Sequence, residues 1–438
     1  MTAAHIRTFA MEFSGMTITR RLIVAGLAIG LAGPAPCGAQ SVVPAGFSAA
    51  RLARIDSVLK RYVDEEKLAG IVVLVLRDGK PAYQAAFGWA DREANRKMTP
   101  DAIFRIASQS KAITSAAIMM LVEEGKVGIG DPVSRFIPGF AKTTVAVRAD
   151  TGRAIVPAKR QITIRDLLTH SAGISYGTDR LVAPLYEAQG LGPAAGFGWY
   201  TADKSEPICT SMERLATLPF VAQPAEAWVY GYNTDILGCV VERASGKPLD
   251  EFIRTRITEP LGMRDTYFFL PPEKRARFTA VYSSTPEGKY TRAPDGPKGQ
   301  GNYVDGPRAS FAGGAGIVST AKDYARFLEM IRLGGAIDGK RYLSPNAAAL
   351  MHTNMVGTLH STDGLGFGLG FETVDRFGAS GLRSEGSFGW AGAYGSWYGV
   401  DPKERLVLVL MIQLMPNSSD IGGRFPTLIY QALEPAPK

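Results

Sequence analysis

An apolar stretch near residue 110 places the strongest constraint on how this chain can fold. Residues 112–122 read Ala-Ile-Thr-Ser-Ala-Ala-Ile-Met-Met-Leu-Val, and Glu123, Glu124 and Gly125 end the run. The pattern predicts a helix that is hydrophobic on nearly every side, and such a helix is buried in the core of a large protein. Other elements must therefore pack around this helix.

A serine and a lysine stand one helical turn apart where this helix begins, in Ser108-Gln109-Ser110-Lys111. Residues three apart share a helix face, so the Lys111 ammonium can reach the Ser108 hydroxyl. The start of a helix also favours negative charge, such as an alkoxide or an oxyanion. The pair predicts a serine nucleophile that is activated without histidine. The alternative is a helix-capping serine beside a surface lysine.

The same S-x-x-K spelling occurs twice more in the chain. Residues 57–60 lie in a polar amphipathic segment, where we expect Lys60 to face water. Residues 319–322 fit the start of a helix that is capped by Thr320. Only the Ser108 match opens a helix that is apolar enough to hold the two side chains in a buried, fixed geometry.

Two other serine patterns imitate catalytic motifs. Residues 173–177 spell G-x-S-x-G, but a nucleophile elbow needs a buried strand before it, and Ser175 follows what reads as a helix end and a turn. Ser344-Pro345-Asn346 spells the S-x-N of some penicillin-recognising enzymes. A serine cap followed by proline at the first helical position explains it as a helix start.

Composition limits the classes of function. The 438 residues are 46% hydrophobic and 21% charged, which is typical of a globular protein long enough for two or three domains, or one large domain with an insertion. The net charge of +8 comes from scattered basic residues without a stripe, so we expect no nucleic-acid partner. Four histidines, without an HExxH pattern or a cysteine cluster, predict neither a metal site nor a cofactor.

The first 39 residues read as a signal peptide. Arg20 and Arg21 precede an apolar run at 22–32, and small residues lead to a cleavage site after Ala39. Met16 is a more usual start for such a signal, which makes residues 1–15 a candidate mis-assigned start. The prediction is an exported, periplasmic protein with no stable membrane span after signal removal; the alternative is a membrane-anchored N-terminal helix.

Two cysteines, Cys209 and Cys239, would remain in the mature chain. Export permits a disulfide between them. Cys239, however, lies in an apolar, helix-like stretch, and free cysteines are commonly buried in such places. We therefore expect a buried free thiol at Cys239 rather than a disulfide.

Strand signals occur near both ends of the chain, and helical signals fill the middle. Strands are expected at 71–76, 82–88, 393–400 and 406–412, and helices at 49–67 and 425–433. The simplest architecture is an α+β fold whose central antiparallel sheet, flanked by helices, is built from 47–111 and 308–435. Residues 112–307 would form an inserted, mainly helical region with active-site loops at 190–207 and 283–307.

Two further segments carry candidate chemistry. In the segment 228–238, Tyr230 could relay a proton if a nearby cation lowered its pKa, or it could be a simple interface aromatic. In Trp390-Ala391-Gly392-Ala393, the glycine suggests close approach of another backbone. A backbone N–H at this strand edge could complete an oxyanion hole; the alternative is a bulged edge strand with a buried tryptophan.

Together these segments resemble the serine β-lactamase and penicillin-binding superfamily, specifically its class C-like branch and the family VIII carboxylesterases. The resemblance covers roughly residues 47–433 and rests on five motifs that occur in the family's order. They are residues 104–111, 162–173, the Tyr230 segment, 313–320 and 390–392. The resemblance implies a β-lactamase/transpeptidase-like fold, which agrees with the architecture expected above.

The resemblance also implies roles for individual residues. Ser108 would be the acylated nucleophile, Lys111 would hold a positive charge or accept the serine proton, and Tyr230 would carry that proton to the leaving group. Which of Lys111 and Tyr230 is the general base stays open. The backbone N–H groups of Ser108 and Ala393 would form the oxyanion hole. The residues that would line the substrate site are Tyr232, Asn233, Trp390 and Gly392.

Two departures from the family pattern bear on the substrate. The class C pattern Y-x-N has Tyr232 at its third place, and Asn233 comes one residue later. Trp390-Ala391-Gly392 replaces K-T-G or H-x-G, which removes a cation and a hydroxyl that would bind a substrate carboxylate. We therefore expect a serine hydrolase that cleaves short-chain carboxylic esters through a Ser108 acyl-enzyme.

Other functions remain compatible with the same residues. A β-lactamase or a D-amino-acid amidase or peptidase could use them, so the partner is a small-molecule ester or amide. A penicillin-binding module without turnover, or an inactive scaffold, is the alternative from another class. The sequence does not indicate an oligomeric state.

Overall fold

The computed structural model describes residues 46–150, 152–192, 201–295 and 301–434. An eight-stranded sheet lies at its centre, with the strand order β12-β13-β14-β15-β16-β1-β2-β3 and antiparallel pairing throughout. Its strands are β1 (Gly70–Arg77), β2 (Lys80–Asp91), β3 (Arg96–Lys97), β12 (Leu365–Phe367), β13 (Glu372–Val374), β14 (Phe388–Ala391), β15 (Trp397–Asp401) and β16 (Leu406–Met411). The predicted α+β class with a central antiparallel sheet is confirmed.

The two ends of the chain meet in the middle of this sheet. β1 pairs with β16 from Val72 opposite Met411 to Arg77 opposite Leu406. Every residue of β1 is buried, because helices cover both faces of the sheet. Alternate residues therefore enter different cores: Val72 and its even-numbered neighbours face one layer, and the odd-numbered residues face the other.

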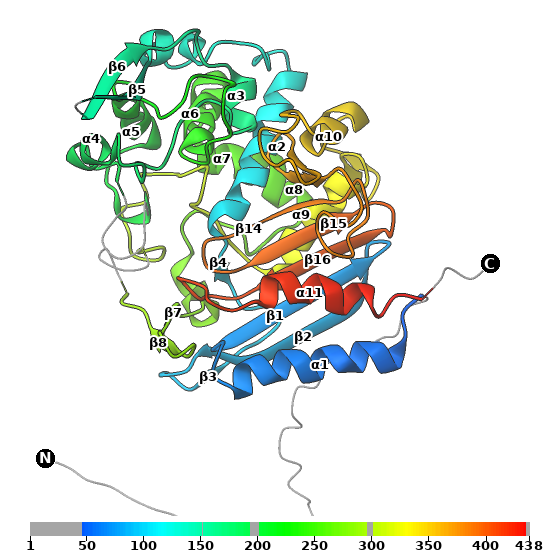
Figure 1. Cartoon of the computed structure of the whole chain (residues 1–438). Coiled ribbons are helices and arrows are strands. Elements are labelled where there is room, and N and C mark those ends of the chain that lie inside the picture. The colour runs from blue at the N-terminus through cyan, green and yellow to red at the C-terminus, as the bar shows by residue number, and fades with distance from the viewer. Residues whose placement is uncertain (1–45, 151, 193–200, 296–300, 435–438) are drawn as a thin grey trace, which may run out of the picture. The chain divides into compact units, whose positions relative to one another are not determined.

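The outer layer consists of helices α1 (Ala49–Asp64) and α11 (Ile421–Tyr430), which lie on the same face of the sheet (Figure 1). Their apolar residues share a core with one side of β1 and β16. On the opposite face, α9 (Ala321–Arg332) packs against β1, β15 and β16. Its N-cap is Thr320, whose side chain accepts a hydrogen bond from the Asp323 N–H, as the sequence predicted.

The helix predicted from the apolar run is α2 (Ser110–Glu123). Twelve consecutive residues, from Ser110 to Leu121, are buried, so the expectation of a helix enclosed on all sides is confirmed. Helices α6 (Asn233–Ser245), α7 (Leu249–Ile253) and α10 (Pro345–Met351) surround it. A short two-stranded pairing of β4 (Phe104–Arg105) with β9 (Val318–Ser319) lies just before its N-terminus.

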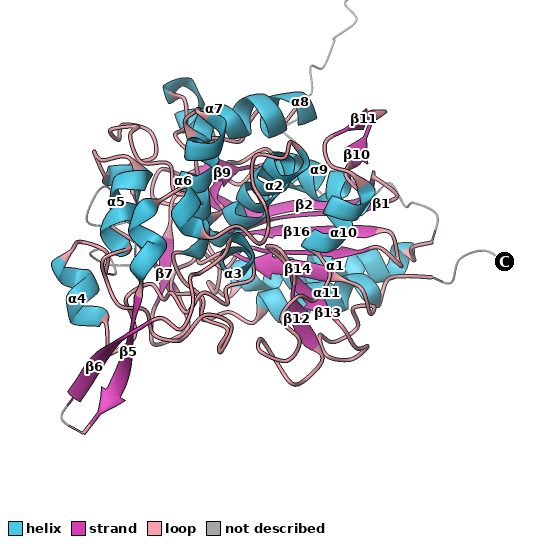
Figure 2. Ribbon diagram, turned by 90° about the horizontal axis from the view of Figure 1, so that it is seen from above, coloured by secondary structure: helices cyan, strands magenta, loops and turns pink. Residues whose placement is uncertain are grey.

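The middle of the chain contains more than helices. Two hairpins, β5–β6 and β7–β8, accompany the helical turns, and the β5–β6 hairpin stands apart from the main sheet (Figure 2). Besides α6 and α7, this region contains β5 (Thr144–Ala149), β6 (Gly152–Pro157), α3 (Ile164–Leu168), α4 (Ala183–Ala188), α5 (Ile208–Leu215), α8 (Glu259–Leu261), β7 (Tyr282–Ser284) and β8 (Tyr290–Arg292). The division into two domains stays a prediction.

The predicted signal peptide at residues 1–39 lies outside the described residues, as does part of the loop expected at 190–207. Among the residues that are described, no helix combines the length and the hydrophobicity that a membrane crossing requires.

A disulfide joins Cys209 in α5 to Cys239 in α6, with an S–S distance of 1.99 Å. The prediction of a buried free thiol at Cys239 was therefore wrong. The stretch around Cys239 is indeed an apolar, buried helix, but α5 packs against it and brings the two Cα atoms to 4.9 Å. Helix-to-helix packing of this kind leaves no local trace in the sequence.

Replacing both cysteines, in Cys209→Ala/Cys239→Ala, should lower the free energy of unfolding. The bridge joins residues 30 positions apart, and the lost conformational entropy of the unfolded chain stabilises the fold by about 3.6 kcal/mol. Urea unfolding with and without a reductant measures the effect: the reductant should destabilise the natural protein and leave the double variant unchanged. Alkylation of either cysteine in the unreduced, denatured protein would contradict the disulfide.

Candidate active site

Ser108, the predicted nucleophile, lies in a 3-10 turn, Ala107–Gln109, that leads directly into α2. Ser108 is 7% exposed and Lys111 is 2% exposed, and the Lys111 Nζ lies 3.2 Å from the Ser108 Oγ. Ala107 has φ of +44°, a conformation that L residues rarely adopt. The structure thus forms the pair predicted from the sequence and holds it in a constrained turn.

Lys111 makes two further hydrogen bonds. Its ammonium donates to the Tyr176 hydroxyl at 2.9 Å and to the Gly314 carbonyl at 2.8 Å. An ammonium has three donors, so Ser108, Tyr176 and Gly314 occupy all of them. The Nζ also lies 4.6 Å from the centre of the Tyr230 ring, within the range of a cation–π interaction. These contacts fix the position of the ammonium.

Tyr230 lies in an aromatic cluster above Lys111. Its hydroxyl accepts a hydrogen bond from the Trp390 indole N–H at 3.1 Å. Its ring centre lies 4.7 Å from that of His170, and the Trp228 ring stacks on it at 5.8 Å. The structure therefore brings together Lys111, Tyr230 and Trp390, which the sequence placed in three separate motifs.

Tyr176 is the site residue that the sequence reasoning missed. It is the residue after Ser175 in the rejected G-x-S-x-G pattern, and the Ser175 hydroxyl accepts a hydrogen bond from the Gly177 N–H at 3.1 Å. Burial raises the pKa of Tyr176 well above its usual value, and nearby Tyr230 adds to the effect, so the phenol stays protonated. A tyrosine in a loop carries no signal of its own that could have shown this role.

A close backbone approach brings Tyr176 to the site. A Cβ at Gly231 would lie 2.1 Å from the Ile174 carbonyl oxygen, so only glycine allows this contact. The segment before α6 can therefore lie directly against residues 174–176. This places Tyr176 and Tyr230 in an edge-to-face arrangement with ring centres 5.7 Å apart.

Tyr232 and Asn233, predicted to contact substrate, are buried inside the protein. The Tyr232 hydroxyl donates to the Leu191 carbonyl. The Asn233 amide nitrogen lies 2.9 Å from His170 Nδ1 and donates to the Val229 carbonyl at 3.2 Å. The structure gives both residues partners within the protein that support the aromatic cluster, and contact with a substrate stays a prediction.

The end of β14 lies against the backbone just before Ser108. A Cβ at Gly392 would lie 2.6 Å from the Ile106 carbonyl oxygen, and the Gly392 N–H donates to the Ser396 carbonyl at 2.7 Å. Ala393 is the next residue in the turn that joins β14 to β15. This arrangement is compatible with the oxyanion hole predicted from the Ser108 and Ala393 N–H groups, which stays a prediction.

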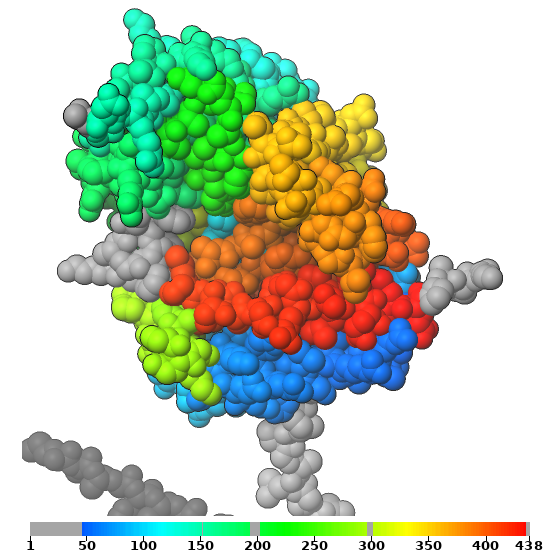
Figure 3. All heavy atoms as spheres, viewed as in Figure 1, coloured from blue at the N-terminus to red at the C-terminus, as the bar shows by residue number. Residues whose placement is uncertain are grey.

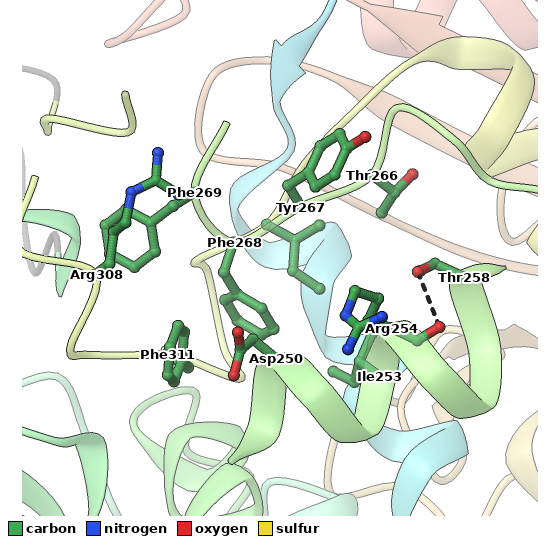
Figure 4. Close-up of a pocket in the computed structure, with 11 residues that line it drawn as sticks. Asp250, Ile253, Arg254, Thr258, Thr266, Tyr267, Phe268, Phe269, Arg308 and Phe311 are labelled. Carbon is green, nitrogen blue, oxygen red and sulfur yellow. Dashed lines mark hydrogen bonds between the residues drawn. The ribbon is translucent and has the colours of Figure 1, made fainter. Parts of the chain in front are cut away.

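The molecular surface is hollowed beside these elements. Figure 3 shows a depression between the green helical region and the orange strands, with cyan atoms, the colour of the chain around α2, at its bottom. A separate cavity of about 160 Å³ is shown in Figure 4; three phenylalanines, Phe268, Phe269 and Phe311, line it together with Asp250 and Arg308. Its lining includes none of the predicted catalytic residues. Among the described residues, no group of three histidine, cysteine or acidic side chains could hold a metal ion.

Comparison with known proteins shows where the chain belongs among enzymes. The family model described as Beta-lactamase matches residues 55–429. Esterase EstB of Burkholderia gladioli is 33% identical over 89% of this chain and 97% of its own length. Lovastatin esterase of Penicillium rubens is 30% identical over 84% of this chain and 94% of its own. The solved structure of EstCE1, a hydrolase with promiscuous acyltransferase activity, is similar with a TM-score of 0.70 and 28% identity, and the match covers 87% of this chain and 98% of that one.

The buried histidine of the cluster should make the protein sensitive to acid. Burial lowers the pKa of His170 well below 6.5, with Lys111 and His360 adding to the effect, and burial also lowers that of His352. Below pH 6.5 the unfolded chain therefore binds protons that the folded protein does not. Stability should fall as the pH drops, by up to about 1.4 kcal/mol per pH unit for each histidine.

Chemical denaturation between pH 8 and pH 5 measures this effect, with His170→Gln as the matched variant. The variant should lose less stability over the interval than the natural protein, because it lacks one proton-binding group in the unfolded state. Parallel stability curves for the two proteins would contradict the assignment of a neutral His170.

Proposed function

Because the chain belongs to the β-lactamase family and is a serine hydrolase with esterase relatives, we propose that it cleaves short-chain carboxylic esters through an acyl-enzyme on Ser108. The observation that carries the proposal is the Lys111 Nζ, buried and 3.2 Å from the Ser108 Oγ. A serine hydroxyl needs a neighbouring base or cation to become a nucleophile, and this lysine is held in place to act on it.

The proposed reaction has two steps. The Ser108 Oγ attacks the ester carbonyl and gives its proton to the general base, and the Ser108–acyl bond forms. The bond to the alcohol breaks, and the alcohol leaves with that proton. Water then attacks the acyl group, its proton returns to Ser108, and the acid is released. The N–H groups of Ser108 and Ala393 would stabilise the oxyanion in both steps, and either Lys111 or Tyr230 would be the general base.

Trp390 supports an ester in preference to a lactam. A β-lactam or a D-alanyl peptide carries a carboxylate, which a cation and a hydroxyl normally bind at this strand. Here the place is taken by an indole whose N–H already donates to the Tyr230 hydroxyl at 3.1 Å. Around it, Trp228 and Phe367 add further apolar surface, with ring centres 6.1 and 5.4 Å from that of Trp390. An uncharged acyl ester suits such a wall.

Export to the periplasm is part of the proposal. The disulfide between Cys209 and Cys239 supports it, because such bonds persist in oxidising compartments.

Ser108→Ala should abolish turnover of p-nitrophenyl butyrate, and the natural protein trapped with a slow ester should carry one acyl group on the peptide that contains Ser108. Ser57→Ala is the matched control, because Ser57 has the same S-x-x-K spelling but lies exposed on α1, where Lys60 pairs with Asp64 at 2.6 Å. An adduct on Ser175, or unchanged turnover by Ser108→Ala, would refute the proposal.

The same protein should also be given a chromogenic cephalosporin and a D-alanyl amide. The proposal expects kcat/KM for the ester to exceed both. A cephalosporin turned over faster than the ester would make the protein a β-lactamase, and labelling by fluorescent penicillin without ester release would make it a penicillin-binding module.

The two tyrosines of the site should differ in their effects. If Tyr230 transfers the proton, Tyr230→Phe should lower kcat by about a hundredfold or more. Tyr176→Phe removes one acceptor of Lys111 and should lower kcat by only about tenfold, with little change in KM. Steady-state kinetics of both variants decide the matter, and the reverse order of effects would assign the proton transfer to Tyr176.

A further inference from the structure

A buried carboxylate lies behind the catalytic lysine. Asp235 is in the first turn of α6, five residues after Tyr230, and is 3% exposed. Its Oδ1 accepts a hydrogen bond from the Gly314 N–H at 3.0 Å. A negative charge in the first turn of a helix is favourable, but burial of a carboxylate is costly unless something compensates it.

The Gly314 residue links this carboxylate to Lys111. Its N–H donates to Asp235, and its carbonyl accepts from the Lys111 Nζ at 2.8 Å. The arrangement requires glycine, because a Cβ at residue 314 would lie 2.5 Å from the Asp235 Oδ2. At Gly313 a Cβ would lie 2.6 Å from the Thr234 carbonyl oxygen, so the whole segment fits closely against α6.

Asp235 is the acidic group that interacts with the charge of Lys111. The titratable groups that face the ammonium are Asp235 on α6, Tyr176 and His170 from the loops after α3, and Tyr230 ahead of α6. Burial lowers the pKa of His170, so its imidazole is deprotonated and neutral, and burial raises the pKa of Tyr176, so its phenol is protonated and neutral. Asp235 is the acidic group among them: burial raises its pKa, and Lys111 and Lys204 are the cations that lower it.

We propose that Asp235 is a positioning residue of this hydrolase, which holds the Lys111 ammonium beside Ser108 through the Gly314 peptide and interacts with its charge. The proposal rests on the acyl-enzyme function proposed above. The two groups interact: burial raises the pKa of Asp235 overall, and among the groups that oppose this rise Lys111 has the largest effect, followed by the Gly314 N–H. The carboxylate and the ammonium stabilise each other across one peptide unit.

The pH profile of kcat/KM tests the proposal. Asp235→Asn keeps the size of the side chain and removes its charge, so Lys111 should lose its proton more easily. The limb of the profile that Lys111 controls should then move to lower pH by about one unit. This is the acidic limb if Lys111 accepts the serine proton, and the alkaline limb if it acts as a cation. We also expect kcat to fall about tenfold with little change in KM.

Asp323→Asn is the matched control. Asp323 also lies in the first turn of a helix, is 7% exposed, and accepts a backbone N–H, that of Asp265, at 2.7 Å. It has no contact with Lys111 among its hydrogen bonds in the described part of the chain. If a buried first-turn carboxylate only stabilises the fold, the pH profile of neither variant should shift. A shift in the Asp235→Asn profile without one in the Asp323→Asn profile therefore shows that Asp235 acts on the site.

The outcomes are distinct. Asp235→Ser serves as a second uncharged variant, and the rates of both variants are divided by the folded fraction that circular dichroism gives at each pH. Profiles that coincide with that of the natural protein, or failure of both variants to fold by circular dichroism, would overturn the proposal. If the natural protein forms no acyl adduct on Ser108, the proposed function itself is wrong; if it forms the adduct and the profile does not move, only the role of Asp235 is wrong.

Discussion

The burial of one ammonium group governs the structure around the site. Lys111 is 2% exposed in the first turn of a helix that is enclosed on all sides. A charge in such a place is tolerated only when its donors are bonded and a counter-charge is near. Ser108, Tyr176 and Gly314 supply the acceptors, and Asp235 is reached through the Gly314 peptide. These contacts bring four separate parts of the chain close together around Lys111.

The same requirement explains several glycines. Gly231 allows the segment before α6 to touch the loop that carries Tyr176, and Gly392 allows β14 to approach the backbone ahead of Ser108. Gly314 lies where any side chain would collide with Asp235. At each of these glycines a Cβ would collide with a neighbouring group, so the elements could not approach as closely with any other residue. The geometry of the site therefore depends on these glycines as well as on the functional side chains.

Aromatic packing shapes the other side of the site. His170, Trp228, Tyr230 and Trp390 form a cluster in which the indole N–H of Trp390 is directed to a phenol. An indole whose N–H is already hydrogen-bonded contributes apolar surface and has little affinity for an anion. This cluster is one ground for the proposed preference for an uncharged ester, and the chain has esterase relatives within the β-lactamase family.

Local patterns in the sequence determined much of this protein. The buried α2 helix, the Ser108–Lys111 pair, the strands at both ends and the order of the motifs follow from hydrophobic period and residue spacing, because these act over one or two turns of chain. The predicted signal peptide and the domain division stay predictions.

Only the tertiary structure decided which distant residues meet. Tyr176 bonds to Lys111 across 65 positions, Gly314 across 203, and Cys209 reaches Cys239 because α5 packs on α6. Tyr232 and Asn233 adjoin Tyr230 in the chain but turn inward with α6. Such contacts depend on how helices and loops pack together, and packing between elements far apart in the chain leaves no periodic signal in the residues of either one.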